Sequence, residues 1–153
     1  MAGLPKTVDE MVMNLTLETQ VKATLEKTFA ALLEQLGPGF ETQEGKSMQM
    51  KLEAWPGGRW YRDLGEGNGH YWATVQAIKR PTLLEFAGPL FASYPFVSNV
   101  QYRLEEKDGG TLITVRHTAM GFIEDQHREG VSKGWGYSLS LVKKAAEGKA
   151  AAR

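Results

Sequence analysis

The residues best suited to acid–base chemistry in this sequence are its three histidines, His70, His117 and His127. A neutral imidazole can orient a bound molecule or move a proton, because its pKa lies close to physiological pH. His117 shares a predicted strand face with Ile113 and Val115, and His127 falls on the apolar stripe of a predicted helix, so both should point inward. Each is a weak candidate for a catalytic acid or base. We favour the alternative, that each satisfies a buried backbone group.

Motifs for other kinds of catalysis are missing. Cysteine is absent, which excludes disulfides, thiol nucleophiles and cysteine zinc sites. Glu124 and His127 have the spacing used in di-iron bundles, but no second such pair exists, so we expect neither a metal nor another cofactor. Gly65-x-Gly67-x-Gly69 precedes strand-like residues rather than a helix, so it predicts a hairpin and not a phosphate site. No hydrolase, zinc-protease or P-loop motif is present, and the sequence therefore does not favour an enzyme.

Composition narrows the class of protein. The 153 residues fit one domain, and Lys+Arg and Asp+Glu are each 18, so no excess of positive charge would attract nucleic acid. No apolar run is long enough to insert into a membrane, and the first residues lack a basic-then-apolar signal pattern. We expect a cytoplasmic protein that is a monomer or a homodimer.

Strand patterns fill the chain between two helical stripes. Residues 1–10 are predicted to be a flexible lead-in, 11–147 a single domain and 148–153 a disordered tail. Thr24 is the predicted N-cap of a helix that ends at Gly37. A long helix is predicted from Phe122 to Glu147. Alternation of apolar and polar residues predicts seven strands, at 11–21, 47–54, 59–64, 70–79, 82–87, 96–106 and 111–120.

Several short motifs resemble one known superfamily. PGGRW at 56–60 is followed by a glycine-rich turn, by Arg80-Pro81 and by LEF at 84–86. The most specific motif is GGTLITVRHT at 109–118, which is followed by Gly134-Trp135. Together they resemble the START-like (SRPBCC) superfamily, nearest to the group homologous to the C-terminal domain of activators of the heat-shock-protein-90 ATPase. The resemblance implies an α+β helix-grip fold, in which a curved antiparallel sheet of about six or seven strands wraps around a long C-terminal helix and an apolar cavity. The loop at 88–96 departs from the family pattern.

Bulky apolar side chains on the strands and the last helix are the predicted ligand contacts, because small ligands are held by apolar pockets with few polar groups. The helix alternates large residues with Gly134 and Ser138, which should leave a dent in its buried face. The predicted ligand-binding residues are Met50, Trp60, Trp72, Phe86, Tyr102, Val115, His117, Phe122, Val131, Trp135 and Leu139.

Three functions remain open at this point. The first is binding of a small hydrophobic or amphipathic ligand, such as a lipid, between the sheet and the C-terminal helix. The second, implied by the resemblance, is a cochaperone-like domain that binds a chaperone or another protein, as in a stress response. The third is a polyketide cyclase-like enzyme that uses His117 or His127. A ligand binder or an enzyme needs a cavity of roughly 300 Å³ or more, whereas an interaction domain needs none.

Overall fold

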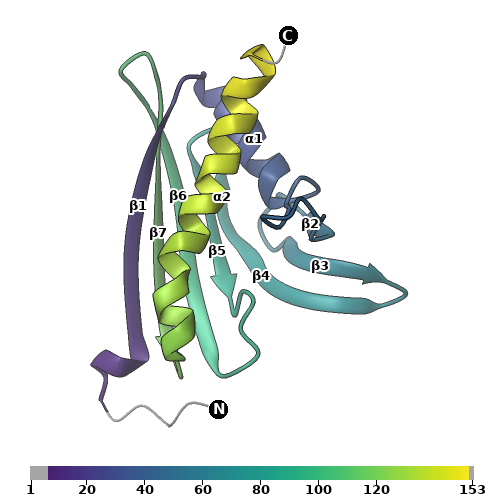
Figure 1. Ribbon diagram of the computed structural model, residues 1–153, viewed down its shortest axis with the longest axis vertical. Coiled ribbons are helices and arrows are strands. Elements are labelled where there is room, and N and C mark those ends of the chain that lie inside the picture. The colour runs from purple at the N-terminus through teal and green to yellow at the C-terminus, as the bar shows by residue number, and fades with distance from the viewer. Residues whose placement is uncertain (1–6, 152–153) are drawn as a thin grey trace.

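A single antiparallel sheet of seven strands and a long helix dominate the computed structural model, which describes residues 7–151 (Figure 1). The strand order is β1-β7-β6-β5-β4-β3-β2, with every neighbouring pair antiparallel. This arrangement confirms the α+β helix-grip fold. In chain order the elements are η1 (Asp9–Met11), β1 (Val12–Val21), α1 (Leu25–Leu36), β2 (Met50–Leu52), β3 (Arg59–Gly65), β4 (Asn68–Lys79), β5 (Leu83–Gly88), β6 (Phe96–Lys107), β7 (Gly110–Gly121) and α2 (Asp125–Ala151).

The concave face of the sheet holds the core. Alternate residues of each strand point to opposite faces, so residues paired across the strands form apolar rows on one face. One row runs from Leu15 through His117, Val100 and Phe86 to Val75. The α2 helix lies over the β1–β7–β6 part of this face, whereas β3 and β4 curl away from it (Figure 1).

The first helix forms where its capping pattern predicts it. Thr24 has an extended backbone, and its side-chain oxygen accepts a hydrogen bond from the Lys27 N–H at 3.2 Å. Phe29, Leu32 and Leu36 form its buried face. The N–H of Gly37 closes the last turn on the carbonyls of residues 33 and 34.

The second helix differs from its predicted bounds at both ends. It starts at Asp125 rather than Phe122, because the Phe122 N–H donates to the Pro95 carbonyl and ties residue 122 to the preceding loop. It continues to Ala151, so residues 148–151, predicted as tail, are helical; their alanines and lysine favour helix. The predictions for residues 1–6 and 152–153 lie outside the described residues.

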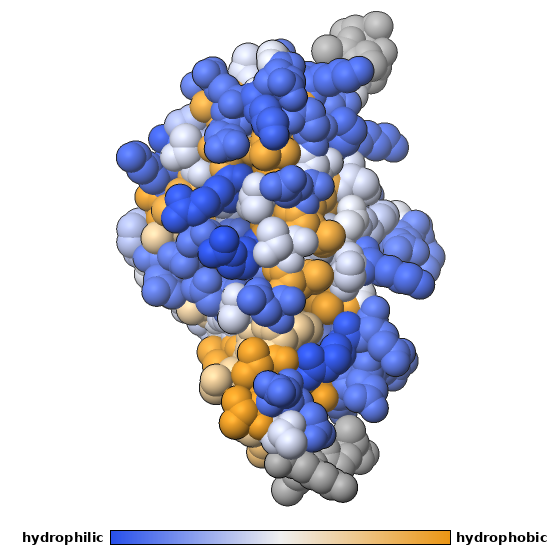
Figure 2. Space-filling view, turned by 90° about the vertical axis from the view of Figure 1, so that its left-hand side faces the viewer, coloured by the Kyte–Doolittle hydropathy of each residue, from blue (hydrophilic) through white to orange (hydrophobic). Residues whose placement is uncertain are grey.

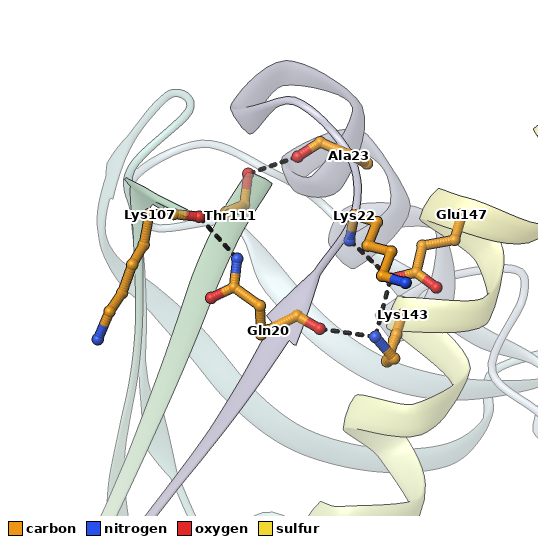
Figure 3. A network of polar contacts seen from close by, with 7 residues as sticks. All are labelled: Gln20, Lys22, Ala23, Lys107, Thr111, Lys143 and Glu147. Carbon is orange, nitrogen blue, oxygen red and sulfur yellow. Dashed lines mark hydrogen bonds and ion pairs between the residues drawn. The ribbon is translucent and has the colours of Figure 1, made fainter. Parts of the chain in front are cut away.

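Both ends of α2 are tied to β1. Near the C-terminal end, Lys143 Nζ donates to the Gln20 carbonyl at 2.7 Å (Figure 3). Glu147 accepts hydrogen bonds from the Lys22 N–H at 2.6 Å and from Lys143 Nζ at 2.8 Å. Near the N-terminal end, Arg128 donates to the Val12 carbonyl of β1 at 3.0 Å and to the Glu10 carbonyl of η1 at 2.9 Å. These contacts fix the helix over one half of the sheet.

The surface on the β1 side is mostly hydrophilic, with hydrophobic side chains gathered in a strip and towards its lower end (Figure 2). At the end of the sheet where β6 begins and β7 ends, Val97 and Met120 are paired and both are about half exposed. Among the described residues, no helix is long and apolar enough to cross a membrane.

Candidate functional site

A cavity of about 370 Å³ lies on one flank of α2. It lies between α2, the end of α1, residues 40–48 (called here the mouth segment), the start of the β5–β6 loop, and side chains of β3 and β4, and it is open to solvent on one side. Its lining residues are Gln35, Phe40, Glu41, Thr42, Gln43, Met48, Trp60, Trp72, Leu90, Phe91, Gly130, Val131, Gly134, Trp135, Tyr137, Ser138 and Leu141.

Small residues of α2 form one wall of the cavity. Gly130, Gly134 and Ser138 are spaced four apart, so they lie along one line of the helix. A Cβ added at Gly130 or Gly134 would meet no atom within 4 Å. Val131 and Trp135, one position further along, are buried against the sheet. The sequence pattern predicts that Gly134 lies within the buried stripe of the helix. In the structure the glycines lie beside that stripe.

Aromatic rings form the opposite wall. The centroids of Trp60 and Trp72 lie 5.1 Å apart in an edge-to-face pair, and Phe40 packs edge-on against Trp72 at 5.7 Å. Trp60 Nε1 donates to the Leu36 carbonyl at 2.7 Å, which links this wall to α1. Because the rings pack against one another, this wall of the cavity is apolar and well ordered.

The mouth of the cavity is formed by two irregular segments. The mouth segment is joined to α2 by the Tyr137 hydroxyl, which donates to the Thr42 carbonyl at 3.1 Å. On the other side, Leu90 has a φ of 55° and its N–H donates to the Trp72 carbonyl at 2.8 Å. This turn buries Leu90 and places Phe91, 48% exposed, at the rim.

The structure brings four of the predicted ligand-binding residues to this cavity: Trp60, Trp72, Val131 and Trp135. Six others are buried in the core outside the lining, namely Met50, Phe86, Tyr102, Val115, His117 and Leu139. Phe122 is half-buried ahead of α2 and is also outside the lining. Contact of any of these residues with a ligand stays a prediction.

Several lining residues were not predicted as contacts. Phe40 and Met48 lie in or beside a stretch that reads as polar loop, and they reach the cavity because a backbone bridge between Glu41 and Ser47 folds the mouth segment back. Tyr137 lies on the flank of the helical stripe, where no periodic signal marks it. Their only signal in the sequence is the presence of large apolar groups in irregular or flanking positions.

His117 is a fully paired core histidine. Trp135 Nε1 donates to His117 Nδ1 at 2.9 Å, and since an indole nitrogen can only donate, Nδ1 carries no proton. Nε2 therefore holds the proton and donates to Ser98 Oγ at 2.7 Å. Burial lowers the pKa of His117 to about 4, and the nearby His127 acts in the same direction. The neutral ring thus links β7 to β6 and to α2.

His127 lies at the start of α2 against aromatic side chains of the β5–β6 loop and of β6. Its Nδ1 forms a short hydrogen bond with the Tyr94 hydroxyl, and its ring centroid is 4.7 Å from that of Phe91 and 4.9 Å from that of Phe96. Its Nε2 is buried with no hydrogen-bond partner in the described part of the chain. Burial lowers the pKa of His127, while Glu124 opposes the shift.

Neither inward-facing histidine lines the cavity, although the sequence places both towards one interior. His70, the third, lies on β4 and is also outside the lining. Within residues 7–151, no group of three His, Asp or Glu side chains could hold a metal ion. The geometry thus assigns the cavity apolar contacts, a polar rim and no paired acid and base.

Comparison with known proteins gives the family. A family model described as activator of Hsp90 ATPase homolog 1-like protein matches residues 22–147. The chain belongs to this family. The match confirms the resemblance to START-like proteins that the 109–118 motif indicates. No curated protein matches the chain.

Solved structures share the fold at low sequence identity. An uncharacterised protein from Rhizobium leguminosarum matches with a TM-score of 0.67 and 19% identity, over 88% of this chain and 94% of that one. Ara h 8.0201 matches with a TM-score of 0.63 and 17% identity, over 88% and 97%. The di-domain aromatase/cyclase StfQ of the steffimycin biosynthetic pathway matches with a TM-score of 0.68 and 13% identity, over 94% of this chain and 54% of that one. These likenesses support the fold alone.

In this member of the activator of Hsp90 ATPase homolog 1-like family, the 88–96 loop forms part of the rim. The loop supplies Leu90 and Phe91 to the cavity and Tyr94 to His127. Phe91 links the two regions, since its ring lies 4.7 Å from that of His127 and 5.9 Å from that of Trp72.

Proposed function

We propose that this chain binds a small apolar or amphipathic molecule in the cavity beside α2. The observation that carries the proposal is the cavity itself, whose volume of about 370 Å³ lies within the range of roughly 300–1,000 Å³ typical of ligand sites. The lining is mainly aromatic and aliphatic, so burial of apolar ligand surface would contribute on the order of 25 cal/mol per Å². Gly130 and Gly134 are exposed, and a Cβ added at either would meet no atom within 4 Å, so no side chain narrows this wall of the cavity.

Tryptophan fluorescence can test this directly. Trp60, Trp72 and Trp135 line the cavity, whereas Trp55, the fourth tryptophan, is 58% exposed on the surface. In a Trp55→Phe background the emission comes from the cavity alone. We expect saturable changes on titration with members of a panel of fatty acids, alkylammonium ions, flavonoids and polycyclic aromatics. Native mass spectrometry of the purified protein should reveal any ligand that copurifies.

Two glycines of α2 offer a matched pair of variants. Gly134 lines the cavity and Gly136 does not, yet a Cβ at either position would meet no atom within 4 Å. Gly134→Leu should fill the cavity and abolish the fluorescence response, while Gly136→Leu should leave it unchanged. Both should remain folded, because leucine favours helix over glycine by up to about 1 kcal/mol. Equal binding by both variants would move the ligand site away from this cavity.

The cochaperone-like alternative has one observation in its favour, the exposed apolar pair of Val97 and Met120. If no panel member binds and the native mass is that of the apo chain, the ligand proposal fails and this surface becomes the place to test. Replacing both residues with lysine should then abolish binding to a chaperone or other protein partner. The cyclase-like alternative has less support, because neither His117 nor His127 lines the cavity.

A further inference from the structure

The side chains that line the cavity carry charge of one sign. Glu41 is the only lining residue with a formal charge, and no lysine, arginine or histidine is part of the lining. Its side chain is exposed on the mouth segment and forms no ion pair within residues 7–151. Glu44 and Lys46 lie on the same segment outside the lining and carry opposite charges. A ligand with a charged group beside Glu41 would therefore meet one carboxylate and no cationic lining residue.

The polar groups of the cavity's aromatic side chains are mostly paired or buried. The indole N–H groups of Trp60 and Trp135 and the hydroxyl of Tyr137 already donate to protein acceptors. The N–H of Trp72 is buried and has no hydrogen-bond partner within residues 7–151. The neutral donors left for a ligand are the amides of Gln35 and Gln43 and the hydroxyls of Thr42 and Ser138.

Aromatic faces carry partial negative charge and attract organic cations. Six rings surround this cavity: Phe40, Trp60, Trp72, Phe91, Trp135 and Tyr137. A carboxylate head group at the rim would lie beside Glu41 with no cationic lining residue to pair with. An ammonium group there would instead meet one carboxylate of opposite charge and the nearby aromatic rings.

We propose that the preferred ligands of this site are amphipathic organic cations, with the ammonium group at Glu41 and the apolar body against the rings, and that carboxylates are discriminated against. The inference rests on the proposed function and adds the charge class of the ligand. It separates this site from one for free fatty acids, whose head group has the wrong sign.

Three probes with one alkyl body test the charge preference: decanol, decylammonium and decanoate. Each is titrated into the whole protein by isothermal titration calorimetry, below its micelle concentration and at fixed ionic strength. We expect decylammonium to bind tightest and decanoate to bind roughly tenfold more weakly. The ammonium group is attracted by Glu41 and by the aromatic rings, whereas the carboxylate is repelled by Glu41.

Two substitutions on the mouth segment separate a local effect from net charge. Glu41→Lys should make decanoate bind more tightly than decylammonium. The bridge between residues 41 and 47 should persist, because it is formed by backbone atoms that the substitution does not change. Glu44→Lys makes the same change of net charge at an exposed position outside the lining and should leave the order unchanged. Decanol should bind all three proteins alike.

The outcomes distinguish the two proposals. Binding of all three probes with equal affinity, or an order that Glu41→Lys does not alter, would overturn the charge preference and leave the ligand cavity standing. Equal effects of Glu41→Lys and Glu44→Lys would also overturn it, because they would reflect net charge alone. Failure of decanol and of both charged probes to bind the wild-type protein would overturn the proposed function itself.

Discussion

Acidification is expected to destabilise this protein through His117. The side chain is 1% exposed and both ring nitrogens have partners when the ring is neutral, so a second ring proton has no acceptor. Burial lowers its pKa to about 4 from an ordinary value of 6.5. Because the folded pKa is the lower one, the stabilisation is fully present above pH 6.5 and is lost as the pH falls towards 4. At ~1.4 kcal/mol per pKa unit, the loss is on the order of 3 kcal/mol.

Urea unfolding at neutral pH and at about pH 4.5 measures this effect. His117→Gln keeps an acceptor for Trp135 and a donor for Ser98 but cannot titrate, so its stability should fall much less on acidification. His70→Gln, on the β3–β4 hairpin, is the matched control and should behave as the wild type. Carboxylates such as Glu53, whose pKa is lowered to about 2 by Arg59, lose their contribution at lower pH. A full wild-type loss of stability in His117→Gln would refute the reasoning.

Three further substitutions test contacts that position the cavity. Thr24→Ala removes the α1 cap and should lower the free energy of unfolding by about 1 kcal/mol in urea; an unchanged midpoint would contradict the capping role. Glu147→Gln weakens the contact with Lys143. Because that contact lowers the pKa of Glu147, the stability that it gives the wild type should be lost as the pH falls below 4.5, and the variant should show no such loss. Tyr137→Phe removes the bond to Thr42 and should speed amide exchange in the mouth segment without altering that of β6 and β7; equal protection would assign the segment another anchor.

The sheet and the first helix were predictable because their signals are local. Asp108 and Gly109 both have positive φ, 51° and 78°, which their residue types favour, so the β6–β7 hairpin follows from one dipeptide. Alternation along 111–120 predicted that His117 points inward, and its side chain is buried, with 1% exposed. The end of α2 at Ala151 was missed because helix propensity in its last residues extends beyond the apolar stripe.

The location of the cavity was not predictable in the same way. Helical spacing identified Gly134 as a gap but could not say which neighbouring element the gap faces, since that depends on the curl of β3 and β4 away from α2. The partners of His117 come from two other elements, so no sequence period links Trp135 or Ser98 to it. Phe40 reaches the cavity through the backward fold of an irregular segment. These contacts are nonlocal, and each depends on several elements being in place at once.

The anchoring of α2 has a consequence for how a ligand would reach the cavity. The helix is tied to β1 through Arg128 at one end and through Lys143 and Glu147 at the other, and Trp135 binds His117 between them. Swinging it outward would break all of these contacts together. The mouth segment is held to α2 by the Tyr137 hydroxyl, and Phe91 lies half exposed on the opposite rim. On the proposed function, a ligand would therefore enter at the mouth, between the mouth segment and Phe91, while the sheet and helix stay fixed.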